Sequence, residues 1–208
     1  MPALLSSAYF APIQWFQKLN RYDVCWIEQH DNFVKQTYRN RCVIATANGV
    51  QTLSIPVEKF DDVKCEMHDV CISDHDNWRH QHWNALQSAY GESPFFEYYQ
   101  DDIRPFYEKK WKFLLDFNMG ITHKMCELLD IQPDIRSTDE FIPMGKTDEA
   151  ALPYADFREV IRPKRPLVDI EFVPKPYYQV YEHKIGFQAN LSILDLLFNM
   201  GNEAIFYL

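Results

Sequence analysis

A concentration of cationic and amide side chains lies between residues 35 and 41. Lys35, Arg39 and Arg41 are separated by even numbers of residues, so on a β-strand they share one face, with Asn40 on the other. Arginines about 7 Å apart on a strand are able to hold a diphosphate or a carboxylate through paired hydrogen bonds. These four residues are therefore predicted substrate contacts. The alternative is a solvated strand edge, where positive charge prevents aggregation.

A second group combines an imidazole, a guanidinium and two indoles. Trp78, Arg79, His82 and Trp83 fall in a predicted helix, where residues three or four apart are neighbours. An imidazole beside a guanidinium suits general acid or base catalysis, so His82 and Arg79 are the predicted catalytic residues. Trp78 and Trp83 are predicted to stack on a sugar or a base. The alternative is a helix start whose aromatic side chains pack and whose histidines face water.

The predicted C-terminal helix begins with polar residues. Ser192 and Asp195 are spaced as in a capping box. Alternatively, the start of the helix points with Asn190 toward a bound anion. On this second interpretation Asn190 and Ser192 are predicted substrate contacts.

Cysteine and histidine recur between residues 65 and 75. Cys65, His68, Cys71 and His75 resemble a metal-ligand set in residue type. The segment is predicted to be a strand, which places Cys65 and Cys71 on one face and His68 on the other, so they do not converge on one ion. We expect no metal site, and the sequence identifies no cofactor.

The composition excludes several classes of protein. The 208 residues carry a net charge of −9, with six scattered glycines and five cysteines. A phosphate-binding glycine loop is absent, and an acidic chain is a poor nucleic-acid binder. No apolar run is long enough to span a membrane. The odd number of cysteines and the lack of a secretory signal indicate a cytoplasmic protein with reduced thiols. The oligomeric state is not fixed by the sequence.

The elements that must position these residues form one domain over residues 1–208. Residues 4–28 predict strand, helix and parallel strand, and Asn48-Gly49 predicts a hairpin between 35–46 and 50–58. A strand over 63–73 and three helices over 77–91, 93–107 and 108–129 follow. Seven prolines make residues 133–182 irregular, with a short strand at 168–173. A docking helix over 190–200 completes a three-layer α/β or α+β fold.

Several of these stretches together resemble the WbqC-like protein family. The resemblance covers roughly residues 1–130 and 177–201 and rests on Tyr9-Phe10-Ala11-Pro12, Trp15-Phe16, Asp23 to Glu28, Lys35, Asn40-Arg41, Leu53 to Val57, Trp78, Tyr90 and Phe187 to Gly201. It implies a bacterial protein of surface-polysaccharide (O-antigen) gene sets, with acyl or aminoacyl transfer to a nucleotide-linked amino sugar. Residues 143–176 take the place of a Gly/Ser-containing segment of longer members, so this chain is expected to differ from them either in substrate or in a reduced activity. The opening also resembles nucleotidylyltransferases with a HIGH motif, but Gln14 and Gln17 stand where their histidines fall.

Two functions are compatible with these observations. The first is a cytoplasmic transferase for an activated sugar or a similar anionic small molecule, such as a nucleotide sugar or an acyl donor. It predicts a concave pocket that contains Arg41 and His82. The second is a non-catalytic binding or scaffold protein that uses the aromatic run Phe95 to Tyr99. It predicts that Arg41 and His82 lie far apart.

Overall fold

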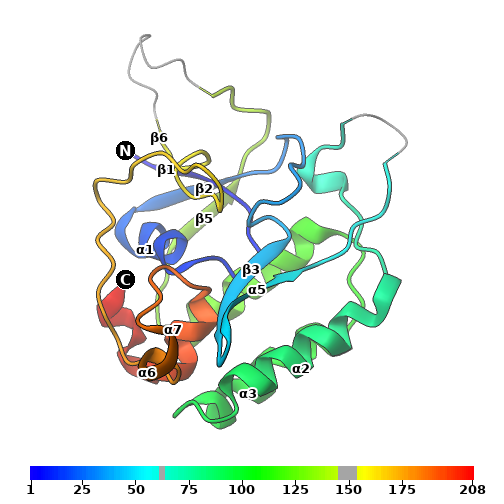
Figure 1. The fold of residues 1–208 in the computed structure, drawn as a ribbon. Coiled ribbons are helices and arrows are strands. Elements are labelled where there is room, and N and C mark those ends of the chain that lie inside the picture. The colour runs from blue at the N-terminus through cyan, green and yellow to red at the C-terminus, as the bar shows by residue number, and fades with distance from the viewer. Residues whose placement is uncertain (61–63, 145–153) are drawn as a thin grey trace.

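A parallel sheet of four short strands forms the centre of the computed structural model, which describes residues 1–60, 64–144 and 154–208. The strands are β1 (Ala3–Ser6), β2 (Val24–Glu28), β5 (Asp134–Ser137) and β6 (Ala155–Asp156), and their order is β5-β2-β1-β6. All neighbouring strands run parallel. Figure 1 shows this sheet with α1 (Ile13–Arg21) packed beside it. The mixed α/β class predicted from the sequence is confirmed.

The predicted strand–helix–strand opening is confirmed. β1 and β2 pair in parallel from Ala3 opposite Cys25 to Ser6 opposite Glu28, with α1 as the connection. Both strands are largely buried, because apolar side chains gain free energy when they leave water. This pairing brings the carboxyl ends of β1 and β2 to the same edge of the sheet.

The predicted hairpin is present but begins later than expected. β3 (Arg41–Thr46) and β4 (Gly49–Ser54) pair antiparallel, and Gly49 closes the turn with a φ of 119°. Residues 35–40 form turns instead of the predicted strand, and Gln36 has a φ of 64°, which a strand does not allow. Lys35, Arg39 and Arg41 therefore do not share one strand face.

The strand predicted over residues 63–73 is wrong for the described part of that range. Residues 64–73 contain the 3₁₀ helix η1 (Met67–Asp69) and isolated bridges. The backbone of residues 70–72 forms hydrogen bonds with the backbone of residues 112–114, and Ile72 N–H donates to Lys112 O at 2.9 Å. The same contacts explain why the third predicted helix starts at Leu114 and not at residue 108.

The helical block follows the sequence otherwise. It consists of α2 (Trp78–Tyr90) after the 3₁₀ helix η2 (His75–Asn77), α3 (Phe96–Ile103), α4 (Pro105–Glu108) and α5 (Leu114–Leu128). Pro105 separates α3 from α4 because proline cannot donate the helical hydrogen bond. Among the described residues, no helix is both long and apolar enough to cross a lipid bilayer.

The proline-rich part contains strands where none were predicted and lacks the one that was. β5 and β6 lie in it, whereas residues 168–173 form no strand. Asp169 and Glu171 bind Lys18 of α1 at 2.9 and 3.2 Å. The segment therefore follows the helix surface, visible as the yellow and orange chain in Figure 1, and does not join the sheet.

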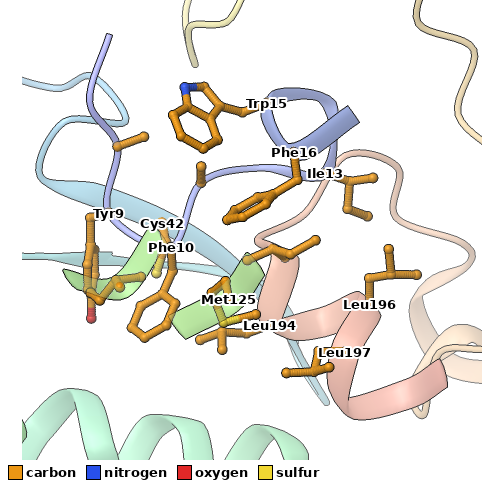
Figure 2. Close-up of a cluster of buried hydrophobic side chains, with 14 of the residues drawn as sticks. Tyr9, Phe10, Ile13, Trp15, Phe16, Cys42, Met125, Leu194, Leu196 and Leu197 are labelled. Carbon is orange, nitrogen blue, oxygen red and sulfur yellow. The ribbon is translucent and has the colours of Figure 1, made fainter. Parts of the chain in front are cut away.

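The C-terminal helix docks as predicted. After α6 (Glu182–Ile185), α7 (Ile193–Met200) begins at Ser192, whose hydroxyl accepts from Leu194 N–H, and ends at Gly201 with a φ of 55°. Figure 2 shows Leu194 and Leu197 of α7 gathered with Tyr9, Phe10 and other buried side chains. The 3₁₀ helix η3 (Gly201–Tyr207) closes the chain.

Candidate functional site

A cavity of about 240 Å³ lies at the carboxyl ends of β1 and β6. Its walls include Ser6, Ser7 and Ala8 at the end of β1, and Phe157 and Arg158 after β6. In open α/β sheets ligands bind outside the carboxyl ends of the strands, where connections leave in opposite directions. The order β5-β2-β1-β6 places this switch point between β1 and β6.

An ion pair between Asp31 and Arg39 forms one wall of the cavity. Asp31 follows β2, and Arg39 ends the turns that precede β3. Arg39 Nη2 also donates to Ser6 Oγ at 2.9 Å, while its carbonyl oxygen accepts from Asn118 Nδ2 at 2.8 Å. Both side chains are more than nine-tenths buried. The guanidinium is thus held in one orientation.

Two polar atoms of this pair are left without a partner among the described residues. They are Oδ1 of Asp31, an acceptor, and Nε of Arg39, a donor. Burial raises the pKa of the Asp31 carboxyl, even though the Arg39 guanidinium lowers it. A buried acceptor and donor without partners cost free energy unless a ligand or water binds them. The ion pair therefore has one acceptor and one donor to spare, both enclosed in this structure.

The base of the cavity is a buried network around Arg158 and Glu28, both fully enclosed. Arg158 donates to Asp156 Oδ2 at 2.6 Å and to Ile142 O at 2.7 Å, and lies 3.4 Å from Glu28 Oε2. Glu28 in turn accepts from Thr138 Oγ1 at 2.9 Å. The network joins the ends of β2, β5 and β6, so it fixes the shape of the cavity.

The remaining cavity wall is mainly apolar and aromatic. It includes the ion pair Glu159–Arg162 and the indole of Trp15, whose Nε1 donates to Ser6 O at 3.0 Å. The apolar wall residues are Leu5, Val34, Tyr38, Phe141, Met144, Phe157 and Ile161. A few fixed polar groups on an apolar wall are typical of small-molecule sites.

Among the cationic and amide residues predicted between positions 35 and 41, Arg39 lines the cavity. Lys35 is exposed. Asn40 is buried and donates from Nδ2 to Ile55 O at 2.8 Å. Arg41 begins β3 and is absent from the described lining of the cavity. The roles of Lys35, Asn40 and Arg41 in ligand binding stay predictions.

The imidazole group lies elsewhere. His82 is buried, with Nδ1 2.9 Å from the hydroxyl of Tyr9 and its ring 5.1 Å from that of Trp78. Burial lowers its pKa to about 4. Arg79 pairs with Asp74 at 2.6 Å and lies over Trp78 at 4.6 Å.

Trp83, Arg79 and Tyr107 line a separate surface hollow of about 400 Å³, and neither His82 nor Arg41 is among its described lining residues. The predicted catalytic roles of His82 and Arg79, and the stacking roles of Trp78 and Trp83, stay predictions.

The residues at the start of α7 hold the helix in place. Asn190 exchanges two hydrogen bonds with Gln14, at 2.9 and 3.0 Å. Ser192 donates to Phe10 O at 2.8 Å while it caps α7. Neither residue lines the described cavity wall, and their contact with a substrate stays a prediction.

Sequence reasoning missed Asp31, Ser6, Ser7 and Arg158. Ser6 ends β1, Ser7 follows it, and Asp31 comes three residues after β2, so their convergence was open to inference from the end of the βαβ unit. Arg158 follows a two-residue strand in the proline-rich part, where no periodic pattern marks it.

Comparison with known proteins gives a family without a stated activity. A sequence model described as the WbqC-like protein family matches residues 7–159. The chain is also 28% identical to the "Uncharacterized protein Rv1507c" of Mycobacterium tuberculosis (strain ATCC 25618 / H37Rv), over 99% of this chain and 96% of that one. No solved structure matches.

Proposed function

The chain belongs to the WbqC-like protein family, and on that premise we propose that it is a transferase that binds a small polar ligand in the cavity beside Asp31 and Arg39. The ligand is part of an activated sugar or a similar anionic molecule, and the reaction is acyl or aminoacyl transfer in surface-polysaccharide biosynthesis. The proposed location is the cytoplasm, in line with five free cysteines.

The observation that carries this proposal is the pair of unpartnered buried atoms. Asp31 Oδ1 accepts a hydrogen bond and Arg39 Nε donates one, so together they match a hydroxyl or an amide group. Sugars and amino acids carry such groups. The cavity, at about 240 Å³, is just below the roughly 300–1,000 Å³ of drug-sized sites. It fits one sugar ring or one acyl group, with the rest of the donor outside.

The charges of the cavity favour an anionic ligand. Three arginines and two acidic residues line it in a chain of net charge −9. The Arg158 guanidinium is occupied by Asp156 and Glu28. Arg39 and the half-exposed Arg162 each pair with one acidic residue of the wall, but a guanidinium has five N–H donors and so keeps donors for a ligand. Guanidinium groups match carboxylates and phosphates in shape.

In the proposed reaction Asp31 serves as the base. It takes the proton of the attacking hydroxyl or amine as this atom forms a bond to the acyl carbon, and the leaving group departs with the electron pair of the broken bond. Burial raises the pKa of Asp31, which makes the carboxylate a stronger proton acceptor. Arg39 holds Asp31 in position and contacts the substrate through Nε.

A thermal-shift screen with nucleotide sugars and acyl-CoA compounds tests the proposal, because a ligand of the folded state raises the melting temperature. Asp31→Asn keeps the shape of the side chain, so we expect binding within a few-fold of the wild type and loss of turnover. Arg136→Gln on exposed β5 is the control and retains both. No shift with any compound, or equal turnover in the two variants, would contradict the proposal.

A second candidate is a non-catalytic binding protein, favoured by an exposed aromatic patch. Tyr98 and Tyr178, which line one surface hollow, are 75% and 55% exposed. Large exposed apolar side chains often mark protein contacts. Phe96 and Tyr99 of the predicted aromatic run are instead buried. A Tyr98→Ser variant that changes the oligomeric state in light scattering, with turnover absent from the wild type, would favour this candidate.

A further inference from the structure

Two histidines from distant parts of the sequence face each other on the surface. Three backbone hydrogen bonds of 2.8, 2.9 and 3.1 Å join residues 29–33 to residues 65–68, and Asn32 forms a bridge to Glu66. The rings of His30 and His68 are held 5.0 Å apart as a result. Their approach is therefore set by the backbone and not by the rotamers of free surface side chains.

The carboxylate of Glu66 lies between the two rings. Its Oε2 is 3.1 Å from His30 Nδ1 and 3.4 Å from His68 Nδ1. One ligand atom from each of the three residues lies within 4.8 Å of the others. Ligand bonds of about 2.0–2.1 Å in a tetrahedral zinc site place ligand atoms about 3.3 Å apart. Two separations already match, and small side-chain rotations bring the imidazole nitrogens together.

The surroundings of His68 favour its Nδ1 as a ligand. Its other nitrogen, Nε2, lies 3.3 Å from Asp69 Oδ2. Metal-bound histidines commonly donate their second N–H to a carboxylate in this way, which leaves the first nitrogen free for the metal. That nitrogen also lies 3.1 Å from the carbonyl oxygen of Gln29, a contact that places a proton on Nδ1 in the metal-free protein, and a bound metal ion takes the place of this proton. The two imidazole nitrogens and the Glu66 carboxylate thus face one point.

We propose that His30, Glu66 and His68 bind one divalent transition-metal ion, with Zn²⁺ as the best match. Two imidazoles and one carboxylate form a donor set that zinc uses. The side chains of the three residues are 25%, 49% and 35% exposed, so the ion reaches the site from solvent and keeps a position for water. None of the three ligands is among the described residues that line the cavity, although their neighbours Asp31 and Asn32 are. The proposal does not depend on the proposed transferase function.

The proposed site uses only His68 of the cysteine and histidine motif between residues 65 and 75. Cys65, Cys71 and His75 are not part of the group that the described residues form. His68 instead finds its partners in Glu66 and in His30, which lies 38 residues earlier in the printed sequence. Spacing within one segment did not reveal this pairing.

Titration of chelator-treated protein with Zn²⁺ by calorimetry, and with Co²⁺ by visible absorption, tests the site at about pH 7, because metal affinity depends on pH. We expect one ion per chain and an absorption band typical of tetrahedral Co²⁺. His30→Gln and His68→Gln should each weaken Zn²⁺ binding at least about tenfold. Zn²⁺ should raise the melting temperature of the wild type and not of these variants.

Two control variants separate the proposed ligands from their neighbours. The double variant Cys65→Ser/Cys71→Ser and the variant His75→Ala should bind Zn²⁺ like the wild type. Circular dichroism verifies that every variant is folded. Unchanged affinity in the folded His30→Gln protein, loss of binding in the cysteine variant, or weak binding without saturation would each overturn the proposal.

Discussion

Asp195 of α7 is a buried carboxylate whose hydrogen bonds come from neutral groups. It accepts from Tyr177 at 2.6 Å, Tyr90 at 2.9 Å and Gln179 at 3.0 Å. Burial raises its pKa from the ordinary 3.8 to about 6, although these hydrogen bonds lower it. Between about pH 4 and 6 the folded protein therefore holds a proton that the unfolded chain has released. Its contribution to stability is present at low pH and is lost as the pH rises through about 6.

The size of this effect follows from the pKa difference. Each pH unit inside the window changes the free energy of unfolding by about 1.4 kcal/mol per proton. Between about pH 4.5 and pH 7 the loss from Asp195 is therefore about 2 kcal/mol. Asp195→Asn keeps the size of the side chain and removes the titration. We predict that the stability of the wild type relative to Asp195→Asn falls by about 2 kcal/mol over this range.

Urea denaturation followed by tryptophan fluorescence measures both proteins at each pH. The comparison between the two is needed because His82 acts in the opposite direction, with a pKa lowered by burial to about 4. His82 is present in both proteins, so its contribution cancels. A difference that stays flat or increases with pH would refute the raised pKa of Asp195.

Further predictions concern stability and use the same denaturation assay. The stability of the wild type relative to His82→Gln should increase by up to about 3 kcal/mol from about pH 4 to 6.5, because unfolding lets the imidazole bind a proton; a flat profile would contradict this. Arg158→Met should cost about 3–5 kcal/mol, since Glu28 stays buried without its cation, and a loss below about 1 kcal/mol would refute the role of the network. Gly201→Ala should cost about 1–3 kcal/mol, because the φ is 55° and a Cβ would lie 2.7 Å from the Phe95 ring; no loss would be the contrary result.

The sequence predicted those helices and strands whose periodicity or turn residues lie within the element itself. The βαβ opening, the Asn48-Gly49 hairpin and the amphipathic α7 have a periodicity or turn chemistry that the sequence displays. β5 and β6 have only four and two residues. Their pairing with β2 and β1 is a long-range contact, so the proline-rich sequence around them gives no indication of a strand.

The candidate site was predictable only in part. Arg39 was identified for its charge, on the assumption of a strand face that the turns at residues 35–40 do not provide. Asp31 was within reach of inference as the acidic residue after a parallel strand. Arg158 and the approach of His30 to His68 were not, because their positions depend on segments more than 30 residues away in the sequence.

The most direct test of the proposed ligand site measures how ligand affinity changes when the Arg39 guanidinium is replaced. Arg39→Lys keeps the positive charge beside Asp31 and removes the Nε donor, while Arg136→Lys makes the same change outside the cavity. Calorimetry should measure the affinity of each protein for the compound that raises the melting temperature of the wild type most. We predict at least about tenfold weaker binding to Arg39→Lys, the effect of one charged hydrogen bond, and wild-type affinity for Arg136→Lys. Equal affinity of all three proteins would contradict a ligand site at Asp31 and Arg39.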